Sequence, residues 1–532
     1  MDFDSLYQRA VAAHRAGRLA EAERGYLQIL AAEPGYTQAR YPLGVLRAQQ
    51  GRPDEALDLI GAALMVTPHA PEMLFNYGNV LMSVGRFPEA VAVFDRALDF
   101  QPANAAILAN RAMVQMRLEY FEAALASFDR ALAIQPGNVN LLQGRADALQ
   151  HLNRDPEALA ALDRLLALHP QDAMAHNNRG NLLKSAGRLE EALAALDKTL
   201  ALQPDYFIAH SNRGNVLKQL GRFGEAIAAF DRCLKLKPDF SPALYNRGKA
   251  LCDDQQIARG FADMMQSARL SKGEAPWSAD KPFQPHKGRH DGEQQDYLRG
   301  LGRGGAMEDI HIEDGARLSG LAVNPVNGAD AGRQWRENRP QLVVIDNLLT
   351  PEALDALRRY CWGSTVWRTP YEDGYLGAFP EHGFAAPLLA QVAEEFRTVF
   401  SGICGNHPLK YIWAFKYDSS LAGIGIHADS AAVNVNFWIT PDDANLDPDH
   451  GGLVVWDKAA PLDWDFERFN GDIAATRAFL AANGAKAVTV PYRANRAVVF
   501  DSDLFHETDT IRFRDGYLNR RINITLLYGS RA

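Results

Sequence analysis

The chain has 532 residues and a formal net charge of −9, from 56 basic and 65 acidic side chains. This length predicts two or more domains. The acidic balance argues against a general binder of nucleic acid or of anionic membranes, which would normally be basic. The four cysteines lie far apart without a CxxC pair, which excludes a disulfide framework and a zinc ribbon and indicates a reducing compartment.

The first residues are acidic and lack an apolar signal core, and no apolar run is long enough to span a bilayer. We therefore expect a soluble cytoplasmic protein that binds neither membranes nor nucleic acid.

Residues 1–272 carry a strict repeat of 34 residues. Its clearest mark is a row of prolines at Pro34, Pro68, Pro102, Pro136, Pro170, Pro204 and Pro238. A period held over seven copies indicates stacked units of one supersecondary type. Each unit predicts two short helices. The proline ends the second helix, and a glycine ends the first at Gly17, Gly51, Gly85, Gly187 and Gly221.

Small and aromatic residues recur in register, as in the unit 71–104 with Gly78, Ala90 and Phe94. This pattern resembles the tetratricopeptide repeat (TPR). The resemblance covers seven units and a degenerate eighth, in which Gly260 replaces the alanine and Lys272 the proline, as expected of a terminal capping unit. It implies an all-α, right-handed solenoid with a concave face.

One position of the first helix is polar where packing does not require it. It is occupied by Asn76, Asn110, Asn178, Asn212 and Asn246, while Gly144 interrupts the row. Side-chain amides can bond an extended peptide backbone without reading its sequence. The row is similar to the asparagine ladder in the TPR groove of O-GlcNAc transferases. The two interpretations are a peptide-binding groove and a solvated face inherited through repeat duplication.

Composition changes at residues 273–340, where Gly, Asp, Arg and Gln are common and helical periodicity fades. We expect an irregular connecting segment there. A new domain then spans 341–532. It opens with an apolar strand at 341–349 and a helix that begins at Thr350 and Pro351.

Further strands of this domain are predicted at 411–417, 433–440, 452–456, 487–490, 497–500 and 521–528. Many short strands with turns between them predict a β-sandwich or jelly roll with flanking helices. Tyr411, Trp413 and Trp438 are expected in its core.

Three side chains of this domain suit a metal ion. His427 and Asp429 are two residues apart, so on a strand they point to the same face. His506 follows an apolar strand. Two histidines and one carboxylate form the facial triad of non-haem Fe(II) oxygenases.

The last predicted strand also carries polar groups on one face. Ile522, Ile524 and Leu526 share one face, whereas Arg521, Asn523 and Thr525 share the other. A planar guanidinium such as that of Arg521 can hold a carboxylate through two parallel hydrogen bonds.

This order of HxD, distant His and strand-borne Arg resembles the 2-oxoglutarate/Fe(II)-dependent dioxygenases, over residues 341–532. More closely, it resembles a bacterial family in which TPR arrays precede such a domain. The resemblance implies a double-stranded β-helix that uses Fe(II), 2-oxoglutarate and O2. It assigns iron binding to His427, Asp429 and His506.

The same resemblance assigns 2-oxoglutarate binding to Arg521, with Tyr417, Asn523 and Thr525 beside it. The interval from His506 to Arg521 is longer than in many members and contains three further arginines, Arg512, Arg514 and Arg520. Asn434 and Asn436 share a strand face near the triad. They either orient substrate or cosubstrate, or form structural hydrogen bonds.

The resulting expectation is an oxygenase that hydroxylates a protein or peptide recruited by the TPR groove and releases succinate and CO2. One alternative is a small-molecule biosynthetic substrate. A second is a TPR scaffold with a sensory or inactive oxygenase-like domain. The acidic balance disfavours a third, a nucleic-acid demethylase.

Overall fold

The computed structural model describes residues 2–271, 285–303, 315–371, 374–418 and 423–531. Its contacts divide the chain into two compact units, Met1–Ala209 and His210–Ala532, which are described in turn. Across the described residues, no helix is both long enough and apolar enough to cross a membrane.

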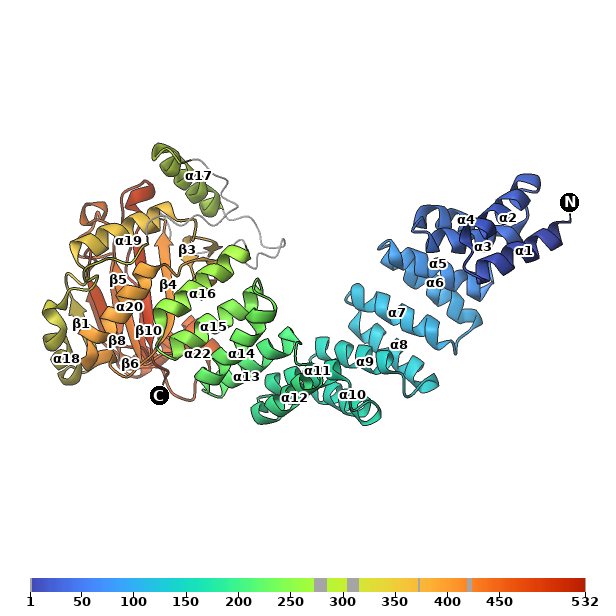
Figure 1. Ribbon diagram of the computed structural model, residues 1–532. Coiled ribbons are helices and arrows are strands. Elements are labelled where there is room, and N and C mark those ends of the chain that lie inside the picture. Colours follow the sequence, from blue (N-terminus) through green and yellow to red (C-terminus); the bar gives the residue numbers. More distant parts are fainter. Residues whose placement is uncertain (1, 272–284, 304–314, 372–373, 419–422, 532) are drawn as a thin grey trace. The chain divides into compact units, whose positions relative to one another are not determined.

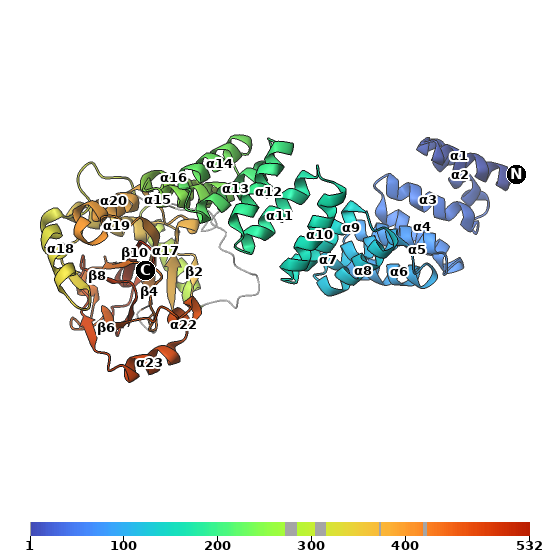
Figure 2. The same cartoon turned by 90° about the horizontal axis from the view of Figure 1, so that it is seen from below.

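The first unit consists of antiparallel helix pairs that follow one another in chain order (Figures 1 and 2). Its helices are α1 Phe3–Arg15, α2 Leu19–Ala32, α3 Thr37–Gln49, α4 Pro53–Val66, α5 Pro71–Ser83, α6 Phe87–Phe100, α7 Ala105–Arg117, α8 Phe121–Ile134, α9 Val139–His151, α10 Asp155–Leu168, α11 Ala173–Ser185 and α12 Leu189–Leu202. The first helices α1, α3, α5, α7 and α9 also contact one another in this order. They therefore form a continuous row.

Local sequence explains the helix ends. Gly17, Gly51 and Gly85 take φ values of 73–76° just after the first helix of their repeats, as predicted for C-terminal caps. Where the glycine is missing, Glu119 and Asn153 adopt the same left-handed conformation, with φ of 62° and 56°. The 34-residue period thus fixes backbone geometry even where the residue type changes.

The second unit starts with more helix pairs and continues into a β-rich region. Its helices are α13 Phe207–Gln219, α14 Phe223–Leu236, α15 Ser241–Asp253, α16 Ile257–Leu270, α17 Pro285–Gly300, α18 Gly328–Glu337, α19 Pro351–Gly363, α20 Pro387–Val399, α21 Ser401–Cys404, α22 Phe466–Gly471 and α23 Ile473–Ala482. Helices α17 and α18 lie in the segment that was expected to be irregular. That expectation was wrong because the periodicity of α17 is weak, with polar residues at most of its positions.

Two antiparallel sheets form the β-rich region. The strands are β1 Leu342–Ile345, β2 Thr369–Pro370, β3 Tyr375–Ala378, β4 Leu409–Tyr417, β5 Val433–Trp438, β6 Leu453–Ala459, β7 Ala487–Val490, β8 Ala497–Asp501, β9 Leu504–Thr508 and β10 Ile522–Tyr528. The larger sheet has the order β1-β8-β5-β10-β4-β3-β2, and the smaller has the order β7-β6-β9. All six strands predicted beyond residue 400 are present.

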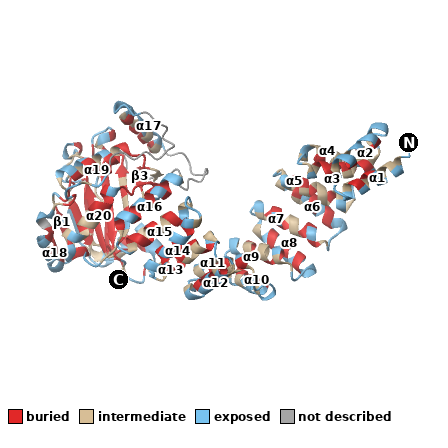
Figure 3. Ribbon diagram, viewed as in Figure 1, coloured by how far each residue is buried: buried red, intermediate tan, exposed pale blue. Residues whose placement is uncertain are grey.

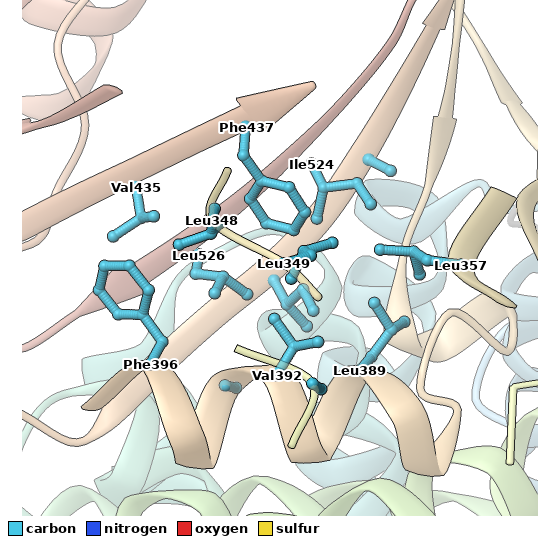
Figure 4. Packing of buried hydrophobic residues seen from close by; sticks show 14 of the residues in the cluster. Leu348, Leu349, Leu357, Leu389, Val392, Phe396, Val435, Phe437, Ile524 and Leu526 are labelled. Carbon is cyan, nitrogen blue, oxygen red and sulfur yellow. The ribbon is translucent and has the colours of Figure 1, made fainter. Parts of the chain in front are cut away.

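The larger sheet has two different faces. One face packs on α19 and α20 in a large apolar core that includes Phe437 and Ile524 (Figure 3). Figure 4 shows Leu389, Val392 and Phe396 of α20 turned toward these strands. The alternation predicted for 521–528 is confirmed, because Ile522, Ile524 and Leu526 all belong to this core.

The last helix pair does not behave as a free cap. Ile257, Phe261 and Met264 of α16 belong to the same apolar core as α20, and α16 contacts α20 directly. Gly260 is required by close packing, since a Cβ there would lie 2.6 Å from the carbonyl oxygen of Gly248. The interpretation of Gly260 as decay in a terminal repeat was therefore wrong.

Candidate metal centre and adjoining cavity

Backbone pairing brings His427 next to His506, which lies 79 residues later in the chain. His427 and His506 form an isolated antiparallel bridge, with hydrogen bonds of 2.9 Å and 2.8 Å in the two directions. His506 lies on β9, whereas Asp429 follows the bridge outside any strand. The expectation that His427 and Asp429 share a regular strand was therefore wrong, although their side chains still converge.

The three side chains form a compact donor set. One donor atom from each of His427, Asp429 and His506 lies within 4.8 Å of the others. The Asp429 carboxylate lies 4.0 Å from Nε2 of His427 and 3.5 Å from Nε2 of His506. In each ring, Nδ1 faces a backbone oxygen, that of Gly425 at 2.8 Å or of Leu504 at 3.1 Å. A protonated Nδ1 leaves Nε2 bare and directed at the shared centre, as a metal ligand requires.

The surroundings of the site also favour the protonation states that can bind a metal ion, an uncharged imidazole and an ionised carboxylate. Burial, aided by the neighbouring His506, lowers the pKa of His427 to about 4. Burial acts to raise the pKa of Asp429, but the hydrogen bond with His506 and the nearby histidines outweigh it and lower that pKa. At neutral pH the set is thus an uncharged imidazole at His427 beside a carboxylate. This donor set fits Fe(II).

A buried chain of hydrogen bonds holds the carboxylate in place. Asn434 on β5 donates to Oδ2 of Asp429 at 2.7 Å, and Asn436 donates to Asn434 at 2.5 Å. Asn523 and Thr525 on β10 both donate to Oδ1 of Asn436, at 2.8 Å and 2.9 Å. Asn434 is fully buried and holds the Asp429 carboxylate, while Asn436, Asn523 and Thr525 also line the cavity beside the triad.

Arg521 is the arginine that reaches this interior. Its Nε and Nη2 donate to the carbonyl oxygens of Gly451 and Gly452 at 2.7 Å and 3.0 Å. Its guanidinium carbon lies 4.7 Å from the centre of the Tyr417 ring. Nη1 is buried and has no hydrogen-bond partner among the described residues. An unpaired cationic donor in a buried site is suited to an anionic ligand.

The neighbouring arginines point elsewhere. Arg520 is bonded to Glu293 of α17 at 3.0 Å and lies 3.5 Å from Asp418. Arg512 and Arg514 are exposed. Among the four candidates, only Arg521 lines the cavity beside the triad.

The triad opens into a cavity of about 650 Å³. One wall is aromatic and comes from β3, β4 and the segments before and after β3, with Tyr371, Tyr375, Phe379, Tyr411, Trp413, Phe415 and Tyr417. Tyr371 and Tyr375 stack with ring centres 4.5 Å apart. The placement of Tyr411 and Trp413 in the core was therefore wrong, whereas Trp438 is fully buried as expected.

Sequence reasoning missed the rest of this aromatic wall. One signal was available, because Tyr411, Trp413, Phe415 and Tyr417 alternate along a single strand and must share a face. The contribution of β3 carried no comparable signal, since β3 is only four residues long.

The asparagines of the helical repeats make contacts along their row. Asn76 donates to the Tyr41 hydroxyl at 2.5 Å, and Asn110 donates to Asn79 at 2.6 Å. Asn246 accepts from Lys218 at 3.0 Å. Asn178 accepts from Asn177 at 3.2 Å, and Asn212 lies in α13. All five lie on the first helices of their pairs.

Comparison with known proteins identifies the repeats. The family model described as "Tetratricopeptide repeat" matches successive overlapping segments, at residues 7–71, 41–105, 76–139, 109–173, 144–207, 177–241 and 211–262. No curated protein matches the chain.

Solved structures of other repeat proteins are similar to parts of the chain. YrrB, titled "a TPR protein with an unusual peptide-binding site", is 25% identical over 35% of this chain and 95% of its own, with a TM-score of 0.31. MamA is 22% identical over 30% and 94%, with a TM-score of 0.30. A tetratricopeptide repeat protein from Parabacteroides merdae is 18% identical over 48% and 98%, with a TM-score of 0.36.

Proposed function

Residues 7–262 are tetratricopeptide repeats, and from this premise we propose that the chain is a 2-oxoglutarate- and Fe(II)-dependent oxygenase acting on a protein or peptide that the repeats recruit. The observation that carries the proposal is the convergence of His427, Asp429 and His506 beside the unpaired Nη1 of Arg521. The two antiparallel sheets around this site are consistent with a double-stranded β-helix.

Each part of the site has a distinct task in this proposal. His427, Asp429 and His506 would hold the iron, and Arg521 would bind the distal carboxylate of 2-oxoglutarate. When bound, iron and 2-oxoglutarate supply the oxidising power for hydroxylation of a C–H bond, with release of succinate and CO2. The Asn434 amide keeps the Asp429 carboxylate oriented.

The aromatic wall supplies the substrate side of the cavity. Apart from Asp429, no acidic side chain lines the cavity in the described part of the chain. Burying a charged group there would be costly without a partner. The cavity therefore suits an uncharged substrate group packed against Tyr411, Trp413 and Phe415.

The wall also adjoins the last repeat. Lys249 of α15 lies 5.5 Å from the ring centre of Tyr411 and 5.8 Å from that of Tyr245. Asn246, the last asparagine of the row, is on the same helix. A polypeptide bound along the final repeats would thus meet the cavity rim, which favours a peptide over a small molecule.

The first test is anaerobic addition of Fe(II) and then 2-oxoglutarate to the purified protein, monitored by visible absorption. We expect the metal-to-ligand charge-transfer band of an iron-bound keto acid, and its loss in His427→Ala. His69→Ala is the control, because His69 is exposed and lies between α4 and α5 in the first unit. A folded wild-type protein without the band would refute the proposal.

A second candidate function is a protein-interaction scaffold that performs no oxidation. The match of residues 7–262 to tetratricopeptide repeats favours it, because extended repeat surfaces commonly bind other proteins. Partner binding without iron-dependent turnover would support this candidate.

A further inference from the structure

The first unit contains a second cavity, of about 630 Å³, that lies along the row of first helices. It is bordered by α5, α7 and α9, which contact one another in sequence. Its lining is rich in flexible apolar side chains, including Met82, Met113 and Met116. Met113 is 51% exposed, so part of this apolar lining is open to solvent.

The cavity coincides with an interruption of the polar row. Three residues after each row asparagine lies a second periodic position, occupied by Asn79, Met113, Asp147, Asn181, Asn215 and Lys249. The first position lacks asparagine at Gly144, and the second lacks it at Met113 and Asp147 and again at Lys249 in the last repeat. Met113, Gly144 and Asp147 therefore belong to two neighbouring repeats. All three of these residues line the cavity.

Packing against Phe128 explains why position 144 is a glycine. A Cβ at Gly144 would overlap the ring of Phe128. In other repeats the corresponding ring rests on the glycine of its own first helix, as Phe94 does on Gly78. Ala112 replaces that glycine in the repeat of Phe128, and the ring instead borders Gly144 and the cavity. Asparagine is thus excluded at position 144, and an apolar surface takes its place.

Asp147 gives this apolar cavity a charge. It is half-buried, and it accepts a hydrogen bond from Gln143 at 2.7 Å. Arg117 also lines the cavity, but its guanidinium carbon lies 5.1 Å from the centre of the Phe87 ring. Within the described part of the array, no arginine or lysine, Arg117 included, lies within ion-pair distance of Asp147. By contrast, Asp129 and Asp163, on second helices, each pair with an arginine of the following repeat at 2.6–2.7 Å. Burial raises the pKa of Asp147, so a cation beside it would relieve that cost.

We propose that the array binds an extended segment of a partner protein and that this cavity takes one lysine or arginine side chain of that segment. The methylene stem packs on Met113 and Phe128, and the cationic head pairs with Asp147. Row amides that bond a peptide backbone cannot discriminate sequence, so this cavity supplies the selectivity. The inference rests on the proposed peptide binding by the array and is independent of the iron chemistry.

The test begins with a phage-displayed library of random 12-residue peptides selected on the full-length protein. We expect one position of the selected peptides to be enriched in lysine or arginine. A selected peptide is then made with fluorescein, and its binding is measured by fluorescence anisotropy. Replacing the enriched residue with norleucine, which keeps the stem and removes the charge, is expected to raise Kd at least tenfold.

Variants of the protein assign the effect to the cavity. Asp147→Asn is expected to weaken the basic peptide at least tenfold and to leave the norleucine peptide unchanged, which a double-mutant cycle measures directly. Met113→Asn, which copies Asn79 of the preceding repeat, gives a second test that keeps the carboxylate, and it is expected to weaken both peptides because it removes the apolar surface for the stem. Asp99→Asn is the matched control, because Asp99 is exposed on the second helix α6. Melting curves confirm that each variant is folded.

Three results would overturn the proposal. These are selection of peptides without a basic position, equal binding of the basic peptide by wild type and Asp147→Asn, and failure to select any peptide. The charge-transfer experiment does not involve Asp147, so it reports on the oxygenase separately from these outcomes.

Discussion

At the scale of single residues, two adjacent arginines just before β10 face different surroundings. Arg521 faces the cavity and the carbonyl oxygens of Gly451 and Gly452. Arg520 faces away and is bonded to Glu293 of α17. The sequence alone supported Arg521 through its alternation with Asn523 and Thr525, and the structure places it beside the triad.

This difference predicts that two matched substitutions affect 2-oxoglutarate binding differently. Arg521→Lys keeps the charge but loses the planar fork, and a hydrogen bond to a charged group contributes about 1.5–3 kcal/mol. We therefore expect the Kd for 2-oxoglutarate to rise roughly 10- to 100-fold, measured by calorimetry on the Mn(II)-loaded protein. Arg520→Lys is expected to leave this Kd unchanged. Equal effects of the two substitutions would refute the assignment.

At the scale of elements, α17 is held on the β-rich region by polar contacts, some of them buried. Arg289 pairs with Asp418 at 2.7 Å. His290 is fully buried, with Nε2 lying 3.2 Å from Nζ of Lys416 on β4. Burial and then the charge of Lys416 lower the pKa of His290 well below its usual value. Burial also lowers the pKa of His286 on the same helix.

These shifts predict that α17 loosens in mild acid. The folded pKa of His290 lies below its unfolded value, so its unfolded form takes up a proton first as the pH falls. The contribution of the neutral His290 to the free energy of unfolding is therefore largest above about pH 6.5 and decreases as the pH falls below that value. Hydrogen exchange, corrected for intrinsic rates, is expected to show more uptake in residues 285–300 at pH 5 than at pH 7.5. His290→Gln should reduce this difference, and unchanged uptake in wild type would contradict it.

At the scale of the molecule, the second compact unit joins repeat helices to the β-rich region. Lys410 of β4 pairs with Asp253 of α15 at 2.6 Å, and Glu394 of α20 accepts from the backbone nitrogen of Ala258 at 3.1 Å. Phe261 of α16 lies in the shared apolar core. The last repeats therefore form part of the folding unit that carries the candidate metal centre.

Two shortened chains test this division. Residues 205–532 are expected to melt cooperatively, because they keep α13 to α16 against the β-rich region. Residues 285–532 lose Phe261 and its neighbours, and removal of one large core side chain alone costs about 3–5 kcal/mol. We expect the shorter chain to aggregate or to melt about 6–12 °C lower by circular dichroism, the shift that about 3 kcal/mol gives in a domain of roughly this size. Equal melting temperatures would show that the repeats are dispensable for this fold.

The 34-residue period made the repeats predictable from the sequence, and the two-residue alternation of side chains did the same for the six later strands and the candidate ligands. Both patterns depend only on local spacing. The α17 helix, the bridge between His427 and His506, and the β3 side of the aromatic wall escaped prediction. Each depends on contacts between segments far apart in the chain. The same holds for the cavity at Met113, Gly144 and Asp147, where the sequence showed only a broken row.

The amino-acid sequence by itself determined the eight helix pairs, the alternating faces of the strands and the side chains suited to a metal ion. Helix caps, proline turns and two-residue alternation act within a few residues, so their pattern can be read along the chain. Only the tertiary structure decided that Arg520 bonds to Glu293 of α17. It also decided that the eighth repeat shares an apolar core with α20. Those outcomes arise from burial and close packing between distant segments, for which a sequence has no local mark.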